Sequence, residues 1–222
     1  MLSDLFPILA SRLLPDVVGC GAPPDVYLTF DDGPDPRFTP KLLEILDKHG
    51  CKATFFVTGK KVERHPDIVR AALQAGHAIG AHGYDHKSFW FRKRRSIQED
   101  INRSIGAIAD ITGSSPRLFR PPYGHICSAQ LSHTRDLGIK TVLWSRSAGD
   151  YLATPPTLIE QRISRRSRPG DIILMHDGMK YADNTLMALP AILEAFRARS
   201  LATRPLYANL ICVSKSDGGE HV

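Results

Sequence analysis

Two adjacent aspartates, Asp31 and Asp32, end an apolar run of the sequence and precede Gly33-Pro34. A strand has to stop at a Gly-Pro pair. Both carboxylates are therefore expected at the carboxyl end of a strand, where α/β folds place their chemistry. Paired aspartates before Gly-Pro are also common in turns, where they hydrogen-bond to their own backbone. The pair by itself leaves a catalytic and a turn-forming interpretation open.

Two histidines, His82 and His86, give these aspartates a chemical context. Their spacing of four predicts that both imidazoles lie on one face of a helical turn and reach the same ion. With one aspartate they would fill three positions of a tetrahedral zinc and leave the fourth for water, as in a catalytic site. The other aspartate would then serve as the general base. A histidine pair at this spacing is more often an ordinary surface or core feature, so the interpretation depends on further residues.

Two later segments also place polar residues after apolar runs. Residues 120–124 read Arg-Pro-Pro-Tyr-Gly, and residues 170–178 deliver His176 at the end of a strand-like run. Arg120 stands between Leu118-Phe119 and a Pro-Pro turn that is stiff and lacks backbone donors. This position predicts an inward-facing guanidinium.

With these segments in this order, the chain resembles the polysaccharide deacetylase family of carbohydrate esterases. The resemblance spans about residues 25–213 and rests on five segments: Thr29 to Gly33, His82 to His86, Arg120 to Gly124, a stretch with Trp144, and Leu174 to His176. It implies an α/β fold, the irregular (β/α)7 barrel of that family. It also implies hydrolysis of N-acetyl groups on an amino-sugar glycan, with release of acetate. The glycan would be a polysaccharide, an oligosaccharide or a membrane-associated precursor.

The resemblance further implies a role for each site residue. Three would bind a divalent metal, most often zinc: Asp32, His82 and His86. Four would act in catalysis: Asp31 as base, His176 as acid, Arg120 to orient the base, and Tyr123, whose backbone N–H would help form an oxyanion hole. Five would contact substrate: Pro121, Pro122, Trp144, Tyr151 and Leu174. The chemistry is coherent, because zinc lowers the pKa of its water to about 7 and an imidazole can protonate a departing amine near neutral pH.

The fourth segment departs from the family pattern. Ser147 and Tyr151 stand where the family usually has an aspartate that pairs with the catalytic histidine and a tryptophan. A hydroxyl in place of a carboxylate predicts a lower pKa for His176 than in relatives that keep the aspartate. Asp150 and Asp177 are both available to compensate. The departures also leave open a second interpretation, a non-catalytic carbohydrate-binding protein that retains the fold.

Composition predicts a single domain over residues 1–222. The resemblance implies that this is a catalytic domain with a core at about 25–213 and an N-terminal extension at 1–24. The chain has 222 residues, of which 42% are hydrophobic, enough for one sizeable core. Strand-like runs alternate with helical patterns, which predicts a parallel sheet. The predicted strands lie near residues 25–30, 52–57, 77–81, 117–119, 139–143, 171–175 and 207–213. The predicted helices lie at residues 40–49, 66–75, 96–112, 128–137, 156–166 and 184–199.

A net charge of +6 with a pI near 9.3 raises the question of an anionic partner. Arg92 to Arg95 directly follow Phe89-Trp90-Phe91, a combination that suits an anionic membrane surface or a diphosphate-bearing substrate. The simpler alternative is that Phe89 and Phe91 pack inward while the cations are solvated. A second basic group, Arg162 to Arg168, ends a predicted helix, where cations complement the helix dipole. Nucleic acid is not expected as a partner, because neither cluster has interleaved aromatics.

The first 14 residues form an apolar segment that makes a poor export signal. Asp4 and Pro7 interrupt it, and it has no basic start. The four cysteines show no CxxC spacing, as expected for free thiols in a reducing compartment. We therefore expect a cytoplasmic enzyme, with a peripheral position at the inner membrane face as an option. The N-terminal segment itself is expected to cap the bottom of the barrel or to lie on a membrane surface.

Overall fold

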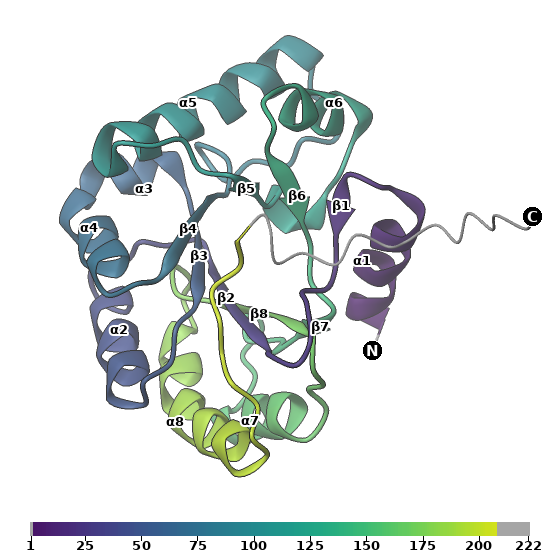
Figure 1. The fold of residues 1–222 in the computed structure, drawn as a ribbon. Coiled ribbons are helices and arrows are strands. Elements are labelled where there is room, and N and C mark those ends of the chain that lie inside the picture. Colours follow the sequence, from purple (N-terminus) through teal and green to yellow (C-terminus); the bar gives the residue numbers. More distant parts are fainter. Residues whose placement is uncertain (1, 208–222) are drawn as a thin grey trace, which may run out of the picture.

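The computed structural model describes the backbone of residues 2–207 and the side chains of residues 6–207. Its centre is a parallel sheet that curls into a half-barrel, with strand order β1-β6-β5-β4-β3-β2-β8-β7 among the described residues (Figure 1). The strands are β1 (Val17–Val18), β2 (Tyr27–Asp31), β3 (Thr54–Val57), β4 (Ala78–Ala81), β5 (Leu118–Phe119), β6 (Lys140–Val142), β7 (Arg146–Ser147) and β8 (Ile172–His176). The parallel α/β architecture expected from the alternating pattern is confirmed.

Helices surround the outer face of the curled sheet (Figure 1). They are α1 (Leu2–Leu13), α2 (Thr39–Lys48), α3 (Gly59–Arg64), α4 (Pro66–Gln74), α5 (Arg94–Thr112), α6 (Ser128–Asp136), α7 (Pro156–Ser164) and α8 (Ala182–Ala198), with a 3₁₀ turn, η1, at Pro122–Gly124. Helices α2, α4 and α7 each begin with a proline in the first turn, where its missing N–H costs no intrahelical hydrogen bond. One large apolar cluster fills the space between helices and sheet, with Phe30, Phe55 and Ile173 among its buried members.

Six of the seven predicted strands and all six predicted helices are present. The remaining predicted strand, at 207–213, lies outside the described residues except for Tyr207, which is not in a strand. Helices α1 and α3 were not predicted. Strands β1 and β7 were not predicted either, because they are only two residues long and too short to show a periodic pattern.

The parallel register brings the strand ends to one edge of the sheet. Asp31, the last residue of β2, lies opposite His176, the last residue of β8, and opposite Phe56 of β3. Ala81, which ends β4, lies opposite Phe119, which ends β5. Polar residues that end or follow strands far apart in the sequence therefore meet at this edge.

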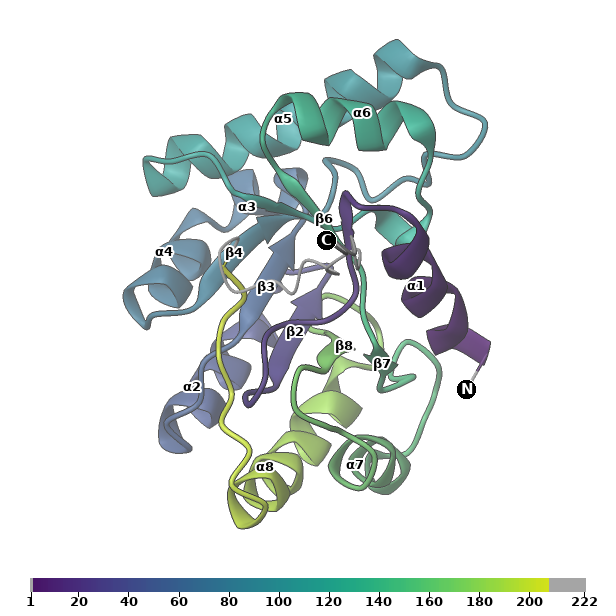
Figure 2. The same ribbon diagram turned by 45° about the vertical axis from the view of Figure 1, so that its right-hand side comes forward.

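The N-terminal segment lies elsewhere than predicted. Helix α1 contacts β1 and β7, the two edge strands of the sheet, and Figures 1 and 2 show it beside them. Its residues Phe6 and Pro7 line a cavity at the carboxyl ends of the strands, so the expected cap at the bottom of the barrel is wrong. The sheet also begins before residue 25, because β1 pairs with β6. No helix within the described residues is both long and apolar enough to cross a bilayer.

Candidate active site

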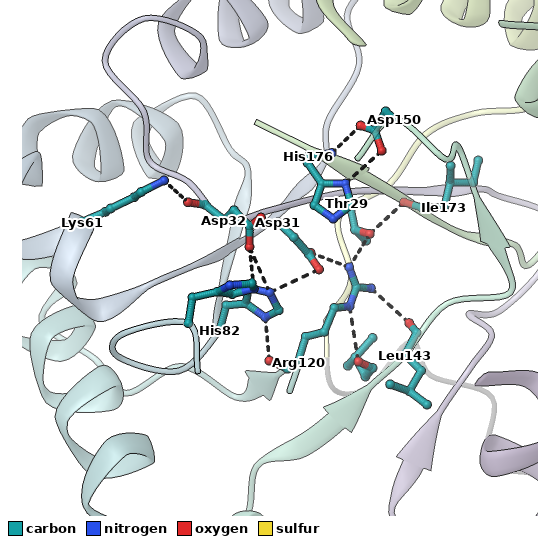
Figure 3. Close-up of polar contacts among 12 residues, drawn as sticks. Thr29, Asp31, Asp32, Lys61, His82, Arg120, Leu143, Asp150, Ile173 and His176 are labelled. Carbon is teal, nitrogen blue, oxygen red and sulfur yellow. Dashed lines mark hydrogen bonds and ion pairs between the residues drawn. The ribbon is translucent and has the colours of Figure 1, made fainter. Parts of the chain in front are cut away.

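Arg120 is the buried centre of the site. Its side chain has no solvent exposure, and its guanidinium donates to Asp31 Oδ1 at 2.7 Å and to Thr29 Oγ1 at 2.7 Å. Further bonds reach the carbonyl oxygens of Val142 and Leu143, and the ring of Phe56 lies 4.1 Å below the guanidinium carbon. A buried charge is tolerated only when it is paired and hydrogen-bonded in this way. The predicted inward-facing guanidinium is confirmed (Figure 3).

Asp32, His82 and His86 converge on one point next to Asp31. Their candidate ligand atoms all lie within 4.8 Å of one another. Asp32 Oδ1 is 2.9 Å from His86 Nε2 and 3.3 Å from His82 Nε2, while Asp31 Oδ2 is 3.6 Å from His82 Nε2. Asp32 holds this position with a φ of 73°, a conformation that costs energy in a non-glycine residue.

A loop brings the two histidines together, and the predicted helical turn is wrong. Residues 82–87 follow β4 without helical structure, and both Gly83 and His86 have positive φ. Gly83 is needed here, because its φ is +72° and an added Cβ would lie 3.1 Å from Asp100 Oδ1. Asp100 in turn accepts the backbone N–H of Tyr84. His82 and His86, four residues apart, therefore come together through a tight loop and not on one face of a helix.

The residues around this point favour a divalent cation. Burial raises the pKa of Asp32, but the two histidines outweigh it and hold that pKa well below its usual range. Burial lowers the pKa of His82, but Asp31 and Asp32 outweigh it and hold that pKa above its usual value. His82 Nδ1 lies 2.7 Å from the carbonyl oxygen of Arg120, which can only accept, so Nδ1 carries the proton. In the neutral ring the lone pair of Nε2 is then directed toward Asp32, the arrangement of a metal-ligating histidine, and a bound cation would take the place of the second proton.

Asp150 partners His176. Its Oδ1 lies 2.9 Å from His176 Nδ1, and its Oδ2 accepts the backbone N–H of His176 at 2.8 Å and the hydroxyl of Thr185 at 2.7 Å. Burial lowers the pKa of His176, but Asp150 and the more distant Asp31 and Asp32 raise it to about 9. The premise of the lower pKa predicted from Ser147 is therefore wrong, because Asp150, in the loop after β7, supplies a carboxylate to His176 Nδ1.

Asp177, the other candidate for this compensation, faces away from His176. It is buried, and its Oδ2 accepts the hydroxyl of Thr39 at 2.5 Å. A Cβ added to Gly33 would lie 2.5 Å from the same oxygen, so Gly33 makes room for this carboxylate. Burial raises the pKa of Asp177 to about 7. Asp177 therefore supports the loop after β2 and is not a partner of the histidine.

Tyr123 sits at the centre of the turn that follows Arg120. Its φ is 60°, and its N–H has no hydrogen-bond acceptor among the described residues, whereas Gly124 N–H donates to Pro121. The ring is exposed and lies 4.6 Å from the ring of His86. The turn thus presents an unused backbone donor beside one of the clustered histidines.

Lys61 joins the two loops that carry the site, a role that the sequence analysis missed. Its ammonium donates to the carbonyl oxygen of Asp32 at 2.7 Å (Figure 3). It also donates to the carbonyl oxygen of Gly178 at 3.1 Å. These carbonyls belong to the loops after β2 and β8. Lys61 itself lies on α3, a helix of only six residues whose sequence shows no pattern that would predict its position.

A cavity of about 480 Å³ opens over the clustered side chains. Asp31, Asp32, His82, His86 and His176 line it together with three of the predicted substrate residues, Trp144, Tyr151 and Leu174. Tyr151 lies edge-on to His176, with ring centroids 5.8 Å apart. The prolines Pro121 and Pro122 are buried below the turn and are not part of the lining, so the structure places them as support for Tyr123. Seven lining residues were not among the predicted catalytic, metal-binding or substrate-binding residues: Phe6, Pro7, Trp90, Gly124, His125, Ser147 and Met179.

Comparison with known proteins places this arrangement in a family. A family model described as polysaccharide deacetylase matches residues 19–142. A chitooligosaccharide deacetylase from Azorhizobium caulinodans is 35% identical over 193 residues, which are 82% of this chain and 92% of the relative.

Solved structures agree with the sequence match. The crystal structure of a peptidoglycan N-acetylglucosamine deacetylase matches with a TM-score of 0.84 and 30% identity, covering 89% of this chain and 94% of that one. A family 4 carbohydrate esterase from Streptomyces lividans, solved in complex with acetate, matches with a TM-score of 0.79 and 33% identity, covering 86% and 98%. The present chain therefore belongs to the polysaccharide deacetylase family.

Proposed function

We propose that this protein is a divalent-metal-dependent hydrolase that removes acetyl groups from an N-acetylated amino sugar in a glycan and releases acetate. The observation that carries the proposal is the convergence of Asp32, His82 and His86 beside the buried Asp31 and the half-buried His176. A relative is named for action on chitooligosaccharides and a structural neighbour for action on peptidoglycan N-acetylglucosamine, which supports this substrate class.

Asp32, His82 and His86 would hold the metal, and we propose zinc. Two imidazoles and a carboxylate are ligands that zinc accepts, and they leave a position open. The backbone carbonyl that fixes the His82 tautomer is the kind of outer contact that ligating histidines have. When bound, the metal would acidify a water molecule and polarise the acetyl carbonyl.

Asp31 is proposed as the general base. Arg120 holds one of its oxygens at 2.7 Å, which leaves the other oxygen directed toward the clustered histidines. A base held in one orientation can remove the proton of an attacking water without first reorganising. Arg120 is therefore a positioning residue, and its full burial means that solvent does not compete for the guanidinium.

The backbone N–H of Tyr123 is proposed to stabilise the oxyanion of the tetrahedral intermediate. It has no acceptor of its own among the described residues and lies on a stiff proline-containing turn beside His86. Such a preorganised donor contributes about 3 kcal/mol in other acyl-transfer enzymes.

His176 is proposed as the general acid. Asp150 stabilises its protonated form, so with a pKa of about 9 the imidazole carries a proton at neutral pH. It can then donate this proton to the departing sugar nitrogen. The alternative, a non-catalytic carbohydrate-binding protein, had rested on the departures at Ser147 and Tyr151. The Asp150 contact removes the first of these two reasons, because it gives His176 a carboxylate partner.

Acetate release from a panel of N-acetylated glycans tests the proposal. The panel contains chitooligosaccharides, peptidoglycan fragments and a lipid-linked N-acetylated sugar, each with the metal-loaded and the chelated protein. We expect acetate from at least one glycan, lost on chelation and restored by zinc. Glycan binding without acetate release at full metal content would instead indicate a carbohydrate-binding protein.

A further inference from the structure

The loop before α5 presents an aromatic side chain fully to solvent. Phe91 has a relative exposure of 105% and a φ of 61°. Both features are unfavourable for phenylalanine, because burial stabilises the ring and positive φ strains a bulky residue. Such outliers persist only where the surrounding structure holds them, and they concentrate at functional sites.

Contacts on both sides of Phe91 hold this loop in place. Phe89 is buried in the core, and the Trp90 ring stacks on His125 with centroids 3.7 Å apart and planes within 5°. Trp90 Nε1 also donates to the carbonyl oxygen of Ile126. Arg92 turns inward to Ser96 and Asp100. Phe91 thus projects from an anchored loop.

Helix α1 adds a second exposed apolar surface next to this loop. Phe6, Leu9 and Leu13 are exposed and follow a helical spacing of three and four, so they form one stripe. Figure 2 shows α1 and the beginning of α5 on the same side of the molecule. Phe6 and Trp90 also line the same cavity, the one above the clustered histidines. The two apolar surfaces therefore flank the opening of the active site.

Cations accompany both apolar surfaces. Arg12 lies beside Leu13 on α1, and Lys93 and Arg94 follow the Phe91 loop; all three lack an acidic partner within the described part of the chain. Arg95, by contrast, pairs with Glu99. We define the mouth face as these three cations together with five apolar residues: Phe6, Leu9, Leu13, Trp90 and Phe91.

We propose that the mouth face docks on an anionic lipid bilayer, so that the active site opens toward the membrane. Aromatic side chains favour the interfacial region of a bilayer, and cations beside them are attracted to anionic headgroups. A second copy of this chain fits less well, because a symmetric contact would bring the like charges of both copies together. Docking would direct the enzyme to glycans at a membrane surface. The binding itself does not depend on the proposed catalysis.

Sedimentation with vesicles tests the proposal. The parent protein should bind vesicles of phosphatidylglycerol and phosphatidylcholine at low salt and should bind pure phosphatidylcholine much more weakly. Replacing both neighbouring cations in Lys93→Gln/Arg94→Gln should weaken binding roughly fivefold per cation. Phe91→Ser should weaken it about tenfold, since it removes an inserting ring. Added salt should weaken it as well, by screening.

Matched controls come from the second basic cluster, at the end of α7, and from another exposed apolar residue. Arg165→Gln/Arg166→Gln changes exposed cations at the end of α7, and Met187→Ser changes an exposed residue of α8. Both should bind vesicles like the parent. Phe91→Ser should also retain activity on a soluble N-acetylated oligosaccharide, because Phe91 is outside the cavity lining.

Three outcomes would overturn the proposal. The first is that the parent protein does not bind anionic vesicles at low salt. The second is that the α7 variant loses as much binding as the mouth-face variants, since attraction would then follow net charge alone. The third is that Phe91→Ser abolishes a dimer in sedimentation velocity without any change in vesicle binding. Loss of activity on every soluble glycan with vesicle binding intact would count against the proposed reaction only.

Discussion

Asp150 contacts His176 at two points, the ring Nδ1 at 2.9 Å and the backbone N–H at 2.8 Å. The carboxylate therefore sets both the orientation of the imidazole and its charge. Thr185 donates to the same carboxylate at 2.7 Å and fixes it from the side of α8. The acid of the proposed reaction thus depends on a residue from the loop after β7.

Replacing Asp150 by asparagine should lower the pKa of His176. The value of about 9 reflects stabilisation of the protonated ring, and removal of the negative charge moves it down toward the ordinary value near 6.5. The alkaline limb of the kcat/KM profile should therefore move to lower pH by a unit or more. Thr185→Val keeps the carboxylate and should move that limb much less. An unchanged limb in Asp150→Asn at full metal content would mean that His176 is not the acid.

Substitutions at Asp31 and Asp32 should affect metal binding and turnover differently. Asp32→Ala removes a proposed ligand and should lose both metal and activity. Asp31→Asn keeps an oxygen for Arg120 and should retain metal, while turnover falls roughly 10²-fold or more. Elemental analysis and acetate release measure the two effects, and thermal unfolding checks that both variants fold. Equal metal loss in the two variants would contradict the division of roles.

Lys61→Met should weaken metal binding although Lys61 is not a ligand. Its ammonium holds the carbonyl oxygen of Asp32 against the loop after β8, and outer contacts of this kind change metal affinity by about 10- to 100-fold. Lys60→Met is the matched control, because Lys60 is exposed and, within the described part of the chain, forms its ion pair with Asp85 alone. Competition with a chelator measures both affinities. Equal affinities in the two variants would leave Lys61 with a purely structural role.

His77 should make the fold sensitive to acid. The ring is buried against Phe55, and its Nδ1 accepts the backbone N–H of Ala53, so burial lowers its pKa to about 4. The unfolded chain binds the proton near pH 6.5 and the folded chain does not. The contribution of the neutral His77 ring to the free energy of unfolding is therefore fully present above pH 6.5. It is lost as the pH drops toward 4, by an amount on the order of 2 kcal/mol.

His77→Asn keeps an acceptor for Ala53 but cannot titrate. We expect it to be less stable than the parent at neutral pH, because it loses the packing on Phe55. The difference from the parent should shrink as the pH falls to 5. Urea unfolding of both proteins at each pH measures this difference, in which the titration of all other groups cancels. A difference that does not change with pH would show that His77 is not the sensitive group.

Local sequence patterns were sufficient to predict the parallel sheet and the types of residue that form the site. Apolar runs that end at Gly-Pro or at a histidine predicted β2 and β8, because a buried strand needs continuous apolar residues and a breaker ends it. The Pro-Pro turn after an apolar pair predicted the buried Arg120. The family resemblance rests on these same segments, and the comparisons confirm it.

Contacts between distant segments were decided only by the tertiary structure. Spacing alone predicted a helical turn at His82 and His86, but the backbone there follows a loop that Asp100 of α5 supports. The same limit applies to Asp150, since loop conformation decides which carboxylate of a short segment reaches His176. Helix α1 reaches the cavity because the curled sheet leaves edge strands β1 and β7 for it to cover. The sequence by itself determined which groups are available at each strand end; their pairing depended on distances that only the folded chain defines.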